Sequence, residues 1–148
     1  MPPAAKAIDV LLIEDDPGDE LITREVFEHN KFNNTLHVAR DGQEGLDYLY
    51  RRGKHRDAPQ PDLILLDLNL PKYDGRQLLE RFKSDPDLCH IPIVVLTTSS
   101  AEEDILRSYQ LHANAYVTKP VDLDQFMSAV RQIDEFFVQV VRLPHKVR

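Results

Sequence analysis

The chain has little cysteine and no long apolar run. Cys89 is the only cysteine among 148 residues, so no internal disulfide can form, which favours a reducing cytoplasm. No apolar stretch is long enough to span a bilayer, and the short apolar run at residues 10–13 cannot form the core of a signal peptide. Internal repeats and low-complexity segments are also missing. A disulfide-stapled domain and a membrane protein are therefore disfavoured.

Basic residues are in deficit, with 18 Lys and Arg against 25 Asp and Glu, for a net charge of −7. This balance argues against nucleic acid or an anionic membrane as the main partner. Hydrophobic residues make up 42% and charged residues 29%, as in ordinary globular proteins, and the length suits one domain with a sizeable core. We expect loose tails at residues 1–6 and 144–148 around one domain at 7–143.

Apolar runs alternate with amphipathic stretches along the whole chain. The runs predict strands at residues 8–13, 36–39, 62–67, 91–96 and 115–118. Unbroken Ile, Leu and Val strands joined by helices indicate a parallel sheet that is covered on both faces. The polar segment 51–62 is long for a link between a helix and a strand; its basic residues could bind an anion, but a solvated loop is the simpler interpretation.

The helices begin at recognisable signals. Asp16 followed by Pro17 predicts an N-cap and a first-turn proline, and Asp41 with Glu44 predicts a capping box. Apolar residues at helical spacing predict a third helix at 75–83. Ser100 and Asp122 start the fourth and fifth helices, the last of which is expected to run to about Val141. The first helix is expected to bury four apolar residues: Leu21, Ile22, Val26 and Phe27.

Polar side chains follow four of the predicted strands. Glu14-Asp15-Asp16 follow the first, Asp67 ends the third, Thr97-Thr98 end the fourth, and Thr118-Lys119 end the fifth. Ligands of open parallel sheets bind outside the carboxyl ends of the strands, so these groups should meet at one edge. A carboxylate within the apolar run 63–68 is then explained, because Asp67 points into this cluster and not into the core.

Neighbouring carboxylates repel each other, and a hard divalent cation relieves that repulsion. Magnesium prefers oxygen ligands, which carboxylates, a backbone carbonyl and water supply. A lysine and a hydroxyl beside them complete an electrostatic cradle for phosphoryl transfer onto Asp67. Each residue alone has a structural explanation, such as a cap or a turn, and only their joint placement favours the site.

This pattern resembles the receiver domain of two-component response regulators over nearly the whole chain. The resemblance rests on Glu14-Asp15, on LLLDLNLPKYDG around Asp67, on VVLTTS around Thr97 and on AYVTKP at 115–120. It implies the CheY-like fold, a doubly wound α/β sheet of flavodoxin type with strand order 2-1-3-4-5. The spacings of 30 residues from Asp67 to Thr97 and of 22 from Thr97 to Lys119 fit the family.

The resemblance also implies a role for each matching residue. Asp67 corresponds to the phosphoacceptor, and Mg²⁺ would be held by Asp15, Asp67, the backbone carbonyl of Asn69 and, through water, Glu14. Glu14 stands where the family more often has Asp. Thr97 corresponds to the switch hydroxyl, Lys119 to the lysine that pairs with the phosphoryl group, and Tyr116 to the switch aromatic. A cis peptide bond is implied before Pro120.

The same resemblance suggests how the protein acts. The chain ends after the predicted fifth helix, so we expect a single-domain regulator that is phosphorylated by a sensor histidine kinase and docks to partners without an enzymatic output. The Glu-Asp pair, the long 51–62 loop and the extended last helix resemble the regulators of phytochrome-type kinases. A homodimer through the fourth helix, fifth strand and fifth helix is expected, with Phe136 and Val141 at its centre.

Two other functions remain open at this point. A phosphohydrolase of the haloacid-dehalogenase type also phosphorylates an Asp beside magnesium, but it uses a second Asp two residues further on, where this chain has Asn69. It also usually needs a cap domain, for which the chain has no room. A receiver-like interaction module that is never phosphorylated is the second alternative, although none of the acid, threonine and lysine positions is lost.

Overall fold

Five strands form one parallel sheet in the order β2-β1-β3-β4-β5. In the computed structural model, residues 8–28, 34–71, 74–98 and 113–131 are described. The strands are β1 (Ile8–Ile13), β2 (Asn34–Ala39), β3 (Leu63–Asp67), β4 (Ile93–Thr97) and β5 (Ala115–Thr118). The predicted parallel sheet and its strand order are confirmed.

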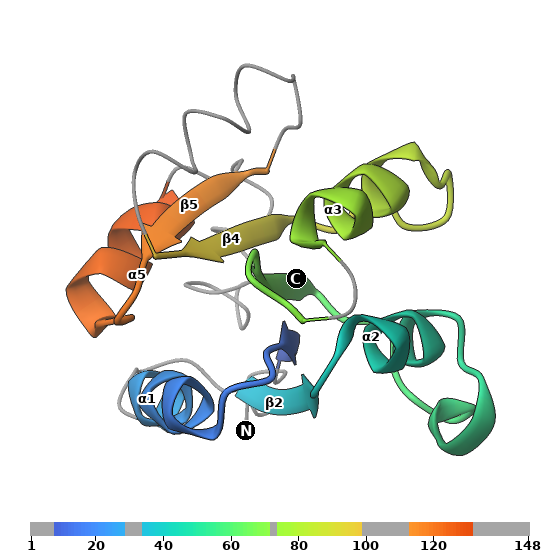
Figure 1. Cartoon of the computed structure of the whole chain (residues 1–148), viewed down its shortest axis with the longest axis horizontal. Helices are drawn as coiled ribbons and strands as arrows, with labels where there is room; N and C mark the ends of the chain where they lie inside the picture. The colour runs from blue at the N-terminus through green and yellow to red at the C-terminus, as the bar shows by residue number, and fades with distance from the viewer. Residues whose placement is uncertain (1–7, 29–33, 72–73, 99–112, 132–148) are drawn as a thin grey trace, which may run out of the picture.

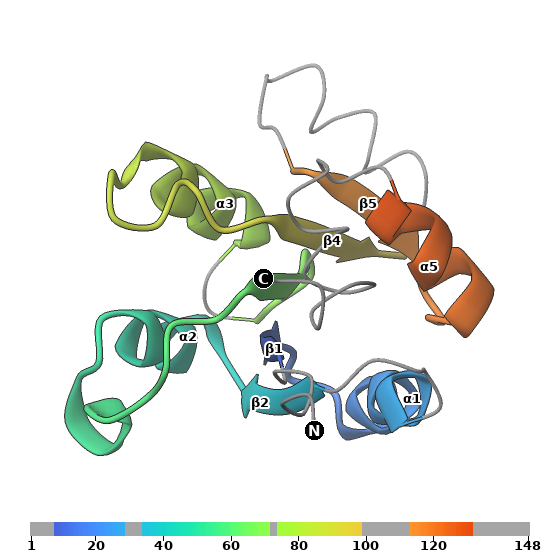
Figure 2. The same cartoon turned by 180° about the vertical axis from the view of Figure 1, so that it is seen from behind.

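The described helices are α1 (Pro17–Glu28), α2 (Gly42–Leu49), α3 (Gly75–Ser84) and α5 (Leu123–Arg131), with a short 3-10 helix, η1 (Gly53–His55). Helices α1 and α5 cover one face of the sheet, and α2 and α3 cover the other (Figure 1). The same arrangement is seen from behind in Figure 2. The helix expected from Ser100 and the part of the final helix beyond Arg131, including Phe136 and Val141, lie outside the described residues.

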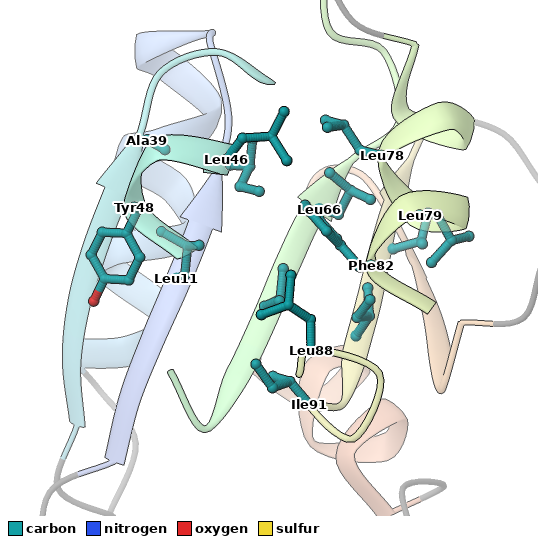
Figure 3. Packing of buried hydrophobic residues seen from close by; sticks show 14 of the residues in the cluster. Leu11, Ala39, Leu46, Tyr48, Leu66, Leu78, Leu79, Phe82, Leu88 and Ile91 are labelled. Atoms are coloured by element: carbon teal, nitrogen blue, oxygen red, sulfur yellow. The ribbon is translucent and has the colours of Figure 1, made fainter. Parts of the chain in front are cut away.

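Alternation along the strands divides the core into two clusters. In β1, Val10 and Leu12 pack toward α1 and α5, whereas Leu11 and Ile13 pack toward α2 and α3. Figure 3 shows the second cluster, in which Leu66, Phe82 and other apolar side chains fill the space between the sheet and its helices. Burial on both faces explains why the strands are apolar without interruption.

Three details of the sequence prediction were wrong. Strand β2 begins at Asn34, two residues earlier than expected. Leu21 is 58% exposed, because α1 turns Glu20, Thr23, Val26 and Phe27 inward instead. Strand β4 begins at Ile93, two residues later than expected. The reason is that the Ile91 N–H already bonds the Leu88 carbonyl in a turn, and Pro92 has no N–H to give to a ladder.

The segment 51–62 contains η1 and is tied to α2 by Glu44. The Glu44 carboxylate accepts from the Arg40 N–H and lies 3.2 Å from Lys54 Nζ and 3.0 Å from His55 Nε2. Two of the basic groups of this segment are therefore already paired within the chain. None of the helices in the described ranges is long and apolar enough to cross a bilayer.

Candidate functional site

The strand alternation brings three site residues to the same face of the sheet. Asp67 ends β3 in phase with Leu63 and Leu65, which pack toward α1 and α5. Glu14 and Lys119 continue β1 and β5 in the same phase, and their backbone N–H groups bond the carbonyls of Ala39 and Thr97. All three side chains consequently point toward the first turn of α1.

Lys119 lies among three carboxylates. Its Nζ is 2.9 Å from Glu14 Oε1, 2.9 Å from Asp19 Oδ2 and 3.2 Å from Asp67 Oδ2. The Lys119 side chain is 10% exposed, and those of Glu14 and Asp67 are 0% and 2% exposed. Sequence reasoning brought Glu14, Asp67 and Lys119 together correctly, whereas Asp19 was missed.

Burial and crowding shift two pKa values in this cluster. Burial, followed by the neighbouring Asp67 carboxyl, raises the pKa of Glu14 to about 8, although Lys119 partly opposes the shift. Burial alone would lower the pKa of Lys119, but contacts with Glu14 and Asp19 outweigh it and raise that pKa above its ordinary value. The lysine is therefore firmly charged, while the acids around it outnumber it.

The acids also suit a divalent cation. One carboxylate oxygen from each of Glu14, Asp15 and Asp67 lies within 4.8 Å of the other two. Glu14 and Asp67 are buried and Asp15 is exposed, so the group opens to solvent on the Asp15 side. Glu14 Oε1 is also buried without a hydrogen bond, despite its proximity to the Lys119 ammonium. Closely spaced oxygen donors with excess negative charge fit a hard cation such as Mg²⁺.

The loop after β3 holds Asp67 in place. The Asn69 N–H donates to Asp67 Oδ1 at 3.0 Å, which leaves Oδ2 facing Lys119. The loop returns to α3 through Gly75, whose N–H bonds the Leu68 carbonyl at 3.2 Å. A Cβ on Gly75 would lie 2.6 Å from that carbonyl oxygen, so the close approach requires glycine.

Thr97 and Tyr116 lie in the opposite phase from Lys119. Thr97 is fully buried at the end of β4, in phase with Ile93 and Val95. Tyr116 is half-buried and packs against the cluster between the sheet and the helices α2 and α3. The last two strands thus present a hydroxyl and an aromatic ring on one face, and a lysine on the other.

Asp16 caps α1, as its sequence context predicted. Its Oδ2 accepts from the Asp19 N–H at 2.9 Å, and its carbonyl accepts from the Glu20 N–H at 2.9 Å. Its carboxylate is not part of the group formed by Glu14, Asp15 and Asp67. The peptide bond between Lys119 and Pro120 is cis, as expected.

The fold and these residues define a receiver domain, and comparison with known proteins agrees. Residues 10–131 match the family model "Response regulator receiver domain". The chain belongs to this family and is the receiver of a two-component phosphorelay. Receiver domains interact with histidine kinases and bind a divalent metal.

Particular relatives can then be named. Response regulator Rcp1 of Synechocystis sp. is 43% identical over 135 residues, which cover 91% of this chain and 92% of Rcp1. The bacteriophytochrome response regulator AtBRR has a TM-score of 0.82 at 43% identity, over 86% of this chain and 93% of AtBRR. The phosphorylated cyanobacterial phytochrome response regulator RcpA has a TM-score of 0.74 at 43% identity, over 94% of this chain and 99% of RcpA. Rcp1 has also been solved in a Mn²⁺-bound form.

Proposed function

We propose that this protein accepts a phosphoryl group on Asp67 from a sensor histidine kinase, in a reaction that requires Mg²⁺. The observation that carries the proposal is the position of the Asp67 carboxylate, which is buried between Lys119 and the acids Glu14 and Asp15. A nucleophilic carboxylate with a cation on each side can approach a phosphoryl group without prohibitive repulsion. The proposal covers one receiver domain at residues 7–143, with no separate enzymatic output.

The chain's own residues divide the work. Asp15, Asp67 and the Asn69 carbonyl would hold Mg²⁺, with Glu14 acting through water; the ion, when bound, neutralises charge on the phosphoryl oxygens. An Asp67 oxygen attacks phosphorus, a P–O bond forms to the carboxylate, and the P–N bond to the kinase histidine breaks. Lys119 supplies a positive charge to the transferred group, and the Thr97 hydroxyl donates to one of its oxygens.

The test uses acetyl phosphate and Mg²⁺ with intact-protein mass spectrometry. The parent should gain one phosphoryl group, released as phosphate after base treatment, while acetate leaves as the by-product. Asp67→Asn keeps the side-chain shape but should gain none, and the matched variant Asp57→Asn, in an exposed loop, should behave like the parent. Equal phosphorylation of Asp67→Asn would refute the assignment, and steady turnover of p-nitrophenyl phosphate would favour a phosphohydrolase.

We infer further that the phosphorylating kinase is of the phytochrome type. The support is similarity to AtBRR and RcpA over most of each chain, because these two relatives are described as a bacteriophytochrome and a phytochrome response regulator. Phosphotransfer from a panel of purified histidine kinases would test it. Transfer that is fastest from a kinase without a bilin-binding module would contradict the inference.

The output is proposed to pass through Thr97 and Tyr116 to the face formed by the helix expected from Ser100, by β5 and by α5. The positions of both residues on the last two strands support this route. Thr97→Ala and Lys119→Ala should still present the Asp67 carboxylate but should lose phosphorylation-dependent partner binding. Unchanged, phosphorylation-dependent binding in both variants would exclude this route.

A two-fold homodimer through the same face is also proposed, with Phe136 and Val141 at its centre. The support is the sequence pattern of the last helix, in which one stripe of apolar residues recurs at spacings of three or four and Phe136, Val141 and Leu143 fall outside it; the stripe comprises Phe126, Val130, Ile133, Phe137 and Val140. Sedimentation of Phe136→Ser/Val141→Ser beside the parent would decide it, since a parent that stays monomeric at high concentration would contradict it. Cytoplasmic location, with no nucleic acid or membrane partner, is proposed from the single cysteine and the net charge of −7.

A further inference from the structure

Lys119 makes a contact that the phosphorylation chemistry does not use. Its Nζ donates a hydrogen bond to Asp19 Oδ2 at 2.9 Å, across 100 residues of sequence. Among the three carboxylate contacts of Lys119, this one has hydrogen-bond geometry, whereas Glu14 Oε1 has no hydrogen-bond partner. The ammonium is thus directed toward α1 at least as much as toward the phosphoacceptor.

Asp19 is held firmly in this position. It lies in the first turn of α1, where its N–H donates to the capping oxygen of Asp16 at 2.9 Å. Its side chain is 32% exposed, compared with 10% for Lys119. Asp19 therefore approaches the lysine from the solvent side, while Glu14 and Asp67 approach from the buried side.

Phosphorylation of Asp67 changes which groups the Lys119 ammonium can bind. A phosphoryl group on Asp67 replaces a carboxylate of charge −1 with an acyl phosphate of about −2 at pH 7, so the group facing the lysine gains about one negative charge and three acceptor oxygens. The ammonium in contact with Asp67, among the described residues, is that of Lys119, 3.2 Å from Oδ2. With Glu14, Asp19, Asp67 and the phosphoryl oxygens around it, the ammonium has more acceptors than its three N–H donors, so Asp19 and the phosphoryl oxygens compete for them.

We propose that Asp19 is a positioning residue that anchors Lys119 in the unphosphorylated protein and lowers the stability of the phosphorylated state. The proposal rests on phosphorylation of Asp67 as argued above. The lysine leaves or weakens its bond to Asp19 as it turns to the phosphoryl group. Asp19 thereby shifts the balance toward the resting state without touching the transferred group.

The test is a titration with beryllofluoride and Mg²⁺, which imitates the phosphoryl group at equilibrium. Asp19→Asn removes the competing charge and should tighten beryllofluoride binding about three- to tenfold, as expected for a partly exposed charged hydrogen bond. The matched variant is Glu28→Gln, which makes the same charge change at the exposed far end of α1 and should stay within twofold of the parent. Unchanged or weaker binding by Asp19→Asn overturns the proposal.

A second measurement separates a bond to Lys119 from a general effect of charge. A double-mutant cycle of Asp19→Asn and Lys119→Met, followed by urea unfolding without metal, should give a favourable coupling between the two side chains. A coupling of zero overturns the proposal, and this result needs no beryllofluoride. If the double variant does not fold, the titration of the single variants still decides. A parent that binds no beryllofluoride refutes the phosphoacceptor function, whereas binding by the parent without tightening in Asp19→Asn refutes only the role of Asp19.

Discussion

Two buried glutamates, Glu14 and Glu20, lie six residues apart and are paired in opposite ways. Glu20 is 8% exposed and receives two guanidinium groups. Arg40 bonds both of its oxygens, and Arg24 donates to Oε2 at 3.0 Å. Glu14 is 1% exposed and shares the single ammonium of Lys119 with Asp19 and Asp67.

The two pKa values record this difference. Burial opposes ionisation of Glu20, but the hydrogen bonds from Arg40 and Arg24 outweigh it and lower its pKa. For Glu14, burial and the neighbouring Asp67 act in the same direction, and its pKa rises to about 8. Similar burial therefore gives opposite results, because the number of cations in contact differs.

The comparison separates a structural ion pair from a site. At Glu20 two guanidinium groups more than offset one carboxylate, so the ion pair links α1 to the end of β2 and leaves no negative charge for a further cation. At Glu14 the chain supplies four acids in contact or close proximity and one lysine, which leaves negative charge for a divalent cation to offset. A deficit of cations, rather than burial alone, marks the functional cluster.

The largest expected effect is on metal affinity. Asp15→Asn removes the exposed carboxylate of the acidic group and should weaken Mg²⁺ binding by more than tenfold in a calorimetric titration. Asp16→Asn should change the affinity by less than twofold, because that carboxylate caps α1 instead. Asp16→Asn should instead lower the free energy of unfolding, measured in urea, by at most about 1 kcal/mol, because Asn also caps helices. Equal loss of affinity in both variants would contradict this division of roles.

The next effect is on stability without metal. Glu20→Ala leaves Arg24 and Arg40 without their acid and should lower the free energy of unfolding by about 1 kcal/mol, a value kept small because both arginines are partly exposed. Glu14→Gln replaces a carboxyl group that ionises reluctantly and should stay within about 0.5 kcal/mol of the parent at pH 7. Urea unfolding in EDTA measures both. A larger loss of unfolding free energy for Glu14→Gln than for Glu20→Ala would contradict the conclusion that Glu20, and not Glu14, forms the stabilising ion pair.

Much of this site could be predicted from the sequence because strand ends are easy to locate. Apolar runs that stop at Glu14, Asp67 and Lys119 place these residues at one edge of any parallel sheet. The cap at Asp16 was equally accessible, since a capping residue and a first-turn proline are adjacent in the chain. In each case residues that are adjacent in the sequence were sufficient to predict the position.

The contacts that were missed have no such local signal. Asp19 and Lys119 meet only through the tertiary packing of α1, because 100 residues separate them in the sequence, and an acid in a first turn normally serves the helix dipole. Leu21 was placed inside because it is apolar, yet two of the four buried residues of α1, Glu20 and Thr23, are polar. Sequence periodicity assigns apolar residues to the inner face of a helix. For a helix such as α1, which buries polar side chains, it therefore predicts the wrong inner residues.

The smallest expected effect is the pH dependence of the Glu20 ion pair. Because the pKa of Glu20 is lower in the folded protein than its ordinary value of 4.5, its ionised form stabilises the fold above that value. The stabilisation is lost as the pH falls through the lowered folded pKa. The difference in unfolding free energy between the parent and Glu20→Ala should therefore be constant from pH 6 to 7 and should shrink below about pH 4.5. Urea unfolding of both proteins at matched pH values measures this difference. A gap that persists unchanged at acid pH would show that Glu20 acts by packing, and the contrast with Glu14 would then not be one of charge.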